Sequence, residues 1–256
     1  MAPDTQLFIA IAKITGYMAA FATMDRMLHA FRFQRPYYAV HVLHNAAVVA
    51  LTWPDLVDTV TRFHEIQRLP NNWDAIYLVY ALHFYHTALY WRSFRFDDWL
   101  HHVLMIGVAL PLGCVVPAGP LVGFSLFFTT GLPGGVGYAA LWLERNGWLS
   151  RLREKQISQL MNVWIRAPGC VAQAALTLAM TFSSPLSTVS TFLWWAGIVE
   201  ALLNAWNGIY FMEQVVVAAT ISRTAAAVQA DENNRDLGDI HLLATNHRHT
   251  TAGHEQ

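Results

Sequence analysis

Residues 97–113 read DDWLHHVLMIGVALPLG, in which two aspartates and two histidines lead directly into an uncharged, mostly apolar run. Two more histidines, His83 and His86, lie in the apolar stretch that precedes it. Ionisable side chains are costly to place in or beside a bilayer, so those that occur there are candidates for function. Whether these histidines belong to a membrane protein or to a soluble core depends on the composition of the whole chain.

The composition indicates an integral membrane protein. Hydrophobic residues make up 55% of the 256 residues and charged residues only 13%, whereas soluble domains carry about 25% charged residues. The net charge of -1 provides no basic patch, so we expect no nucleic-acid partner. Cys114 and Cys170 both fall in apolar stretches and are interpreted as packing residues.

Seven stretches of the chain approach the roughly 20 apolar residues that a membrane-spanning helix needs. They cover residues 6–24, 37–54, 74–92, 99–116, 119–143, 161–183 and 188–219. Beyond them the chain becomes polar, and we interpret residues 221–256 as a flexible tail. The sequence therefore predicts an all-α integral membrane bundle of about seven transmembrane helices.

The basic residues predict the orientation of this bundle. Of the 16 Lys and Arg residues, 12 fall on one side, in the loops after spans one, three and five and in the tail. By the positive-inside rule this side is cytoplasmic, which places the N-terminus outside or in the lumen and the C-terminus inside. We expect the membrane to be that of the endoplasmic reticulum or of another organelle.

Six histidines are predicted to lie near the cytoplasmic side of three successive spans: His41, His44, His83, His86, His101 and His102. The first four form two pairs at a spacing of three residues, and residues three apart share a face of a helix. The last two open the fourth span. All six can therefore occupy one layer of the bundle.

Several interpretations of this layer remain open. The histidines can be polar contacts between helices, each satisfied by a neighbouring group. They can bind non-haem iron together with carboxylates, or ligate a b-type haem from two facing helices. An Asp–His pair can instead perform acid–base chemistry or bind a polar lipid group. The sequence lacks a full H-x-x-H-H block, so haem and iron stay alternatives and no metal or cofactor is assigned.

The order of these motifs resembles the TLC-domain family, which groups ceramide synthases, translocon-associated membrane proteins and regulators of lipid composition. The family's Asp, short spacer and His-His before an apolar span are matched by residues 97–113. Two further runs are similar to later family segments, GLPGGVGYAALWLERNGWLSRLREKQISQLMNVWIRAPG (131–169) and LLNAWNGIYF (202–211). The resemblance covers roughly residues 40–215 and implies a six-helix barrel of spans two to seven, with span one as a peripheral helix.

The resemblance divides the chain into an N-terminal helix and loop (1–36), a TLC-like transmembrane domain (37–220) and the tail (221–256). It implies a cavity that handles or senses long-chain lipids and, in a ceramide-synthase-like member, acyl transfer from acyl-CoA to a long-chain amine or hydroxyl. The family's second His-Asp block is missing, because FFTTGLPGGVGY (127–138) has no ionisable side chain before its tyrosine. Enzyme activity therefore stays open, and a non-catalytic accessory or scaffold subunit of a larger membrane complex is the alternative.

Five residues are the candidates for catalysis if the chain is an acyltransferase: Asp98, His83, His86, His101 and His102. One histidine of the adjacent pair would act as the base. Asp98 lies three and four residues before that pair, shares a helix face with both members and can orient either one. The pair on the preceding span would supply the acid, and acyl-CoA would be the co-substrate.

Five further residues are the candidates for substrate binding: Arg92, Arg95, Arg166, Glu200 and Asn204. The first two lie close enough to the cytoplasmic surface to meet the phosphates of acyl-CoA. Arg166 and Glu200 lie at membrane depth on neighbouring spans. We expect a buried ion pair between them, because an unpaired charge at that depth is costly.

Overall fold

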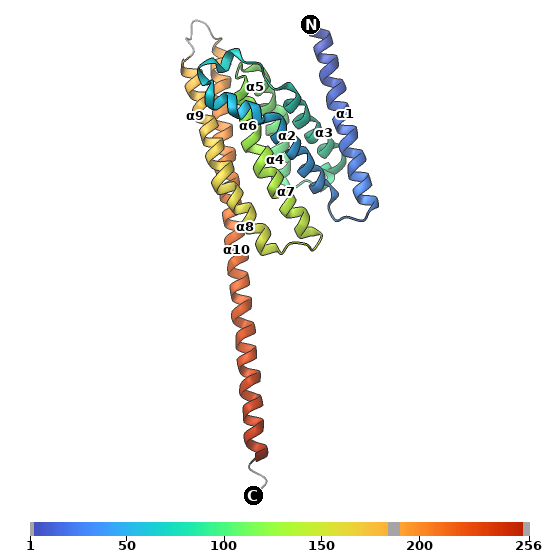
Figure 1. Ribbon diagram of the computed structural model, residues 1–256, viewed down its shortest axis with the longest axis vertical. Helices are drawn as coiled ribbons and strands as arrows, with labels where there is room; N and C mark the ends of the chain where they lie inside the picture. The colour runs from blue at the N-terminus through green and yellow to red at the C-terminus, as the bar shows by residue number, and fades with distance from the viewer. Residues whose placement is uncertain (1–2, 184–189, 253–256) are drawn as a thin grey trace.

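The computed structural model describes residues 3–183 and 190–252, and the side chains of residues 5–183 and 190–232. Every regular element in this part of the chain is helical, which confirms the all-α prediction. The helices run alternately up and down the bundle, and the described termini lie at opposite ends of its long axis (Figure 1). One end of the bundle therefore carries the loops 31–35, 91–95 and 146–150, and we call it the polar end.

Three helices form the first part of the bundle: α1 (Pro3–Ala30), α2 (Pro36–Thr61) and α3 (Trp73–Tyr90). Short helical turns follow the last two: η1 (Phe63–Arg68) and η2 (Trp91–Ser93). α1 packs against α3 and α2 and lies at the edge of the bundle (Figure 1). Its Phe21 joins the apolar core of these helices, and its Asp25 accepts a hydrogen bond of 2.8 Å from the hydroxyl of Tyr90.

Each of the next three segments is one continuous helix interrupted by a π-helical turn. The elements follow in the order α4 (Phe96–Leu104), η3 (Met105–Ala109), α5 (Leu110–Val115), α6 (Pro120–Leu126), η4 (Phe127–Gly131), α7 (Leu132–Arg145), α8 (Arg151–Met161), η5 (Asn162–Arg166) and α9 (Ala167–Ser183). π-Turns inside α-helices often occur at functional sites. The last element, α10 (Thr191–Ala252), is a single long helix.

Within the described residues, four helical segments are long and apolar enough to cross a membrane: Thr5–Ala30, Phe96–Val115, Pro120–Arg145 and Arg151–Ser183. These segments are compatible with an integral membrane protein. The helices α2, α3 and α10 coincide with three further predicted spans and are long enough, but they do not meet the same criteria of apolarity and charge. The number of seven spans and the six-helix barrel therefore stay predictions.

The C-terminal region differs from the sequence prediction. Residues 221–252 continue α10, although the polar sequence predicted a flexible tail there. Residues 225–227 are all alanine, the strongest helix former, and they extend the helix beyond the bundle. The last four residues of the predicted tail, 253–256, lie outside the described residues.

Glycines allow the central helices to approach one another closely. Gly123 of α6 faces Asp55 of α2, and a Cβ atom at Gly123 would lie 1.8 Å from the Asp55 carboxylate. Gly208 of α10 faces Cys170 of α9, where a Cβ atom would lie 2.7 Å from the cysteine Cβ. Small residues are the usual means by which membrane helices bring their backbones together. These contacts fix the register of α2 on α6 and of α9 on α10.

Candidate functional site

A cavity of about 900 Å³ lies inside the bundle. All of its lining residues fall between Arg35 and Val215, so its walls come from the helices after α1 and from the loops between them. A volume of 300–1,000 Å³ is typical of sites for small molecules and cofactors. Three basic side chains line the cavity at its polar end: Arg35, Arg95 and Arg145.

The cavity brings together nearly all of the candidate site residues. Those that line it are His83, His86, Arg95, Asp98, His101, His102, Arg166, Glu200 and Asn204. Arg92 lies outside it, with its guanidinium 5.3 Å from the centre of the Trp91 ring. Of the other two predicted members of the histidine layer, His41 lines the cavity, whereas His44 is buried behind the wall and packs against Phe21 of α1.

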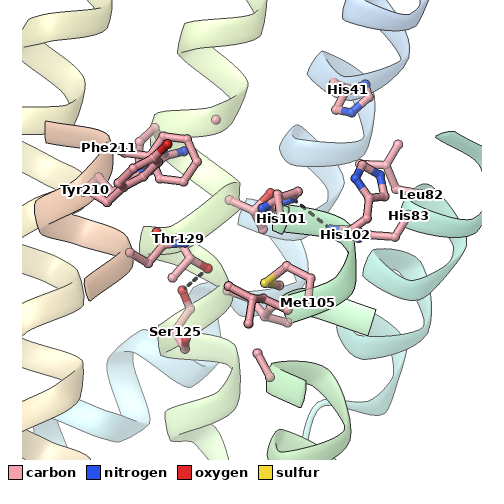
Figure 2. Close-up of a pocket in the computed structure, with 18 of the residues that line it drawn as sticks. His41, Leu82, His83, His101, His102, Met105, Ser125, Thr129, Tyr210 and Phe211 are labelled. Carbon is pink, nitrogen blue, oxygen red and sulfur yellow. Dashed lines mark hydrogen bonds between the residues drawn. The ribbon is translucent and has the colours of Figure 1, made fainter. Parts of the chain in front are cut away.

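Two histidines from different helices contact each other inside the cavity (Figure 2). The Nε2 atoms of His83 and His101 are 3.2 Å apart, and the Nδ1 atom of His83 lies 2.8 Å from the carbonyl oxygen of Val79. A carbonyl oxygen only accepts, so neutral His83 carries its proton on Nδ1. His101 must then donate its Nε2–H to His83, which leaves Nδ1 of His101 without a proton. His101 is thereby held in the form of a base.

The neighbouring imidazoles are held in a similar way. His102 Nδ1 donates to the backbone carbonyl of Asp98 at 2.8 Å, and His41 Nδ1 donates to the carbonyl of Tyr37 at 2.7 Å. The Nε2 atoms of these neutral rings are therefore acceptors as well. His41, His101 and His102 therefore carry proton acceptors, and the acid role that the sequence assigned to His83 and His86 stays a prediction.

Asp98 has a different role from the one that the sequence suggested. Its carboxylate Oδ2 accepts a hydrogen bond of 2.9 Å from the backbone N–H of Arg95, while its contact with His102 is made by the backbone carbonyl. The residue lies in the first turn of α4, where free backbone N–H groups attract acidic side chains. Asp98 therefore positions His102 through the helix backbone, and its carboxylate is occupied at the helix start.

The expected ion pair between Arg166 and Glu200 is not formed among the described residues. Glu200 Oε1 accepts from the amide of Asn204 at 3.2 Å, and the Arg166 guanidinium lies 4.7 Å from the centre of the Phe211 ring. The register of α9 on α10 explains the separation, because Gly208 lies opposite residues 167 and 170. Arg166 is thus level with Phe211, roughly 16 Å along the α10 axis from Glu200 at about 1.5 Å per residue.

A second polar group lies deeper in the cavity than the histidines. The Ser125 hydroxyl donates to Asn204 Oδ1 at 2.7 Å, and Asn204 in turn donates to Glu200. Gln173 of α9 also lines the cavity and donates to the hydroxyl of Thr177 at 2.9 Å. The sequence analysis did not single out Ser125 or Gln173, although a glutamine in the middle of an apolar span is a signal that could have identified the second of them.

The geometry of the histidine layer bears on the two metal alternatives, which both stay predictions. In the described part of the chain, no group of three or more His, Cys, Asp or Glu side chains is placed to hold a metal ion. Two nitrogens that each bind a metal at about 2 Å from opposite sides are separated by about 4 Å. The 3.2 Å between His83 and His101 is too short for a haem iron between them.

No protein-family model, curated protein or solved structure matches the chain. The fold and the cavity themselves therefore define the class: an all-helical protein with membrane-type helices around an internal cavity that is polar at one end.

Proposed function

We propose that the protein is a multi-pass membrane protein that binds a long-chain lipid in the cavity. The observation that carries this proposal is the distribution of polarity along the cavity walls. Histidines and arginines line it toward the polar end. Toward the other end the lining is mostly apolar around the hydrogen-bonded group of Ser125, Asn204 and Glu200, with Leu110, Val116, Leu121, Val122 and Leu126. A lipid would place its headgroup at the histidine layer and its chain along the apolar wall.

The arrangement of helices supports a TLC-like barrel around this lipid. α2 contacts α3 and the α6–α7 segment, which contacts the α8–α9 segment, and α9 contacts α10. α10 contacts α5, and the His83–His101 contact joins α4 to α3. We therefore propose seven spans, with α1 outside a ring of six, a lumenal N-terminus and a cytoplasmic polar end in an organelle membrane.

Lipid occupancy is tested by purifying the protein in mild detergent and identifying bound lipid by native mass spectrometry. Thr129 lines the cavity, and a Thr129→Trp variant should fill it and lose the lipid. Val103 is 60% exposed on the outer face, so Val103→Trp is the matched control and should retain lipid. A wild-type protein that purifies without lipid but with a stoichiometric protein partner would replace this proposal with the accessory-subunit function.

Acyl transfer is a second candidate function, and the protonation state of His101 is the observation that favours it. Its Nδ1 could accept the proton of a long-chain amine or hydroxyl while that group attacks the thioester carbonyl of acyl-CoA. The bond from the carbonyl carbon to sulfur then breaks, and CoA leaves as a thiolate. The cluster of Arg35, Arg95 and Arg145 at the polar end lies where the phosphates of CoA would approach from the cytoplasm.

A further inference from the structure

Arg166 places a permanent positive charge inside the cavity. It ends the π-turn η5 near the middle of the membrane-type segment Arg151–Ser183, and it lines the cavity. A guanidinium stays protonated in proteins, so this residue cannot escape the cost of burial by losing its proton. A charge at this depth is retained where a partner or a ligand compensates it.

No carboxylate in the described part of the chain provides that compensation. Arg166 takes part in none of the ion pairs there. The three acidic residues that line the cavity are engaged elsewhere: Asp97 by a tyrosine hydroxyl, Asp98 by a backbone N–H and Glu200 by an amide. Arg166 instead faces the ring of Phe211, and its buried Nε atom has no hydrogen-bond partner.

A second donor without a partner lies beside the guanidinium. The Oδ1 atom of Asn45 accepts from Thr130 at 3.1 Å and contacts His44 at 2.8 Å, whereas its buried Nδ2 atom has no partner. Both this Nδ2 and the Arg166 Nη2 lie within 4 Å of the point where Gly134 would carry a Cβ atom, at 2.8 Å and 3.8 Å. The Arg166 guanidinium and the Asn45 amide therefore both lie near Gly134, but only Arg166 lines the cavity, whereas Asn45 is fully buried behind its wall.

From the position of Arg166 in the cavity and its lack of an anionic partner, we infer that Arg166 binds the anionic headgroup of the lipid. The ligand class is a long-chain amphiphile whose head carries two or more anionic oxygens, a carboxylate or a phosphate, because planar guanidinium groups bind these groups in a bidentate way. A long-chain amine is disfavoured at this position, since its charge would meet the guanidinium. This inference rests on the proposed lipid-binding function and specifies its headgroup.

Matched ligands with one chain and different heads test the inference. Binding to the purified protein is measured for oleate, oleoyl lysophosphatidate and the neutral methyl oleate, at a mildly alkaline pH where the acids are ionised. The wild type should prefer one of the anionic ligands over methyl oleate by about tenfold or more, as expected for a charge-assisted hydrogen bond. The preferred anion then identifies the head as carboxylate or phosphate.

Three variants assign the preference to the residue. Arg166→Gln should lose the preference for the anionic ligand while still binding methyl oleate. Arg166→Lys should retain part of this preference because the charge remains. Arg62→Gln is the matched control, because Arg62 lies outside the cavity with its side chain 46% exposed, and it should keep the preference in full. Equal binding of anionic and neutral ligands, or an unchanged preference in Arg166→Gln, would overturn the inference and leave lipid binding in place. If none of the three ligands binds, the proposed function fails together with it.

Discussion

Two walls of the cavity are alike in sequence and different in packing. The α4–η3–α5 segment and the α6–η4–α7 segment are both apolar, both contain a five-residue π-turn and both line the cavity. In the most apolar 18-residue stretch of each segment, 11% of the first stretch is buried, compared with 33% of the second. The buried residues of the first segment are His102 and Leu110, whereas the second is held to α2 through its glycines.

The difference in burial assigns different roles to the two walls: one determines the shape of the cavity and the other carries the candidate base. The α6–η4–α7 wall is fixed against α2 along much of its length, so it defines the shape of the cavity. The α4–η3–α5 wall carries the candidate base His101 and has few contacts that constrain it. Parts of a protein with few buried contacts open at lower free energy than the core does. We therefore expect the reactive groups to lie on the more mobile wall.

The largest expected effect is on turnover. If the protein transfers acyl groups, the His101→Ala, His102→Ala double variant should lose about 10²- to 10⁴-fold in rate, the usual contribution of general acid–base catalysis. Its stability should fall by about 1–3 kcal/mol, because His102 is buried and the loss of His101 leaves the buried Nε2 of His83 without a donor, so folding is checked by thermal unfolding. The assay follows product from acyl-CoA and a long-chain amine or alcohol on purified protein.

The control for this experiment is His64→Ala, because the side chain of His64 is 77% exposed and lies outside the cavity. Equal product from the double variant and the wild type would remove both histidines from catalysis. Iron and haem are measured on the same samples. A Soret band or stoichiometric iron that the double variant loses would favour redox chemistry instead.

The next effect concerns a pair of glycines, one on each wall. Gly123→Ala should destabilise the protein by about 2–3 kcal/mol, because the new methyl group would overlap the Asp55 carboxylate that also accepts a hydrogen bond from Asn72. Gly107→Ala on the other wall meets no atom within 4 Å and should be neutral or stabilising by up to about 1 kcal/mol. Thermal unfolding in detergent measures both. Similar losses in the two variants would contradict the difference between the walls.

The smallest effect is on amide exchange. Backbone amides of α4–η3–α5 should exchange at least about tenfold faster than those of α6–η4–α7, because fewer buried contacts must break to expose them. Hydrogen–deuterium exchange with mass spectrometry resolves the two segments. Adding lipid should slow amide exchange in α4–η3–α5 more than in α6–η4–α7. Equal exchange rates of the two segments without lipid would contradict the difference between the walls.

The helical architecture and the histidine layer could be predicted from the sequence because both depend on local patterns. Apolar runs of sufficient length identify membrane-type helices, and the three-residue spacing of His83 and His86 places both on one helix face. Five of the six predicted histidines of the layer do line the cavity. The spacing of histidines along one helix is enough to predict that they share a face, and the positions of neighbouring helices are not needed.

The contacts between helices could not be predicted in the same way. The position of Arg166 relative to Glu200 depends on how α9 and α10 slide along each other, and Gly208 determines that register. The carboxylate of Asp98 is occupied because α4 begins at residue 96, a boundary that the apolar pattern places several residues later. The orientation of the Asn45 side chain, which leaves its Nδ2 without a partner, depends on a hydrogen bond from Thr130, 85 positions further along the chain.

The length of α10 has a mechanical consequence. At about 1.5 Å per residue its 62 residues extend about 93 Å, roughly three times the hydrocarbon thickness of a bilayer. Its upper part carries Glu200, Asn204 and Phe211 in the cavity, and its lower part projects from the bundle without a break (Figure 1). A rigid rod turns along its whole length when one part is turned. A rotation of α10 that a ligand imposes at Asn204 therefore also rotates the residues of α10 that lie far outside the membrane-type segments.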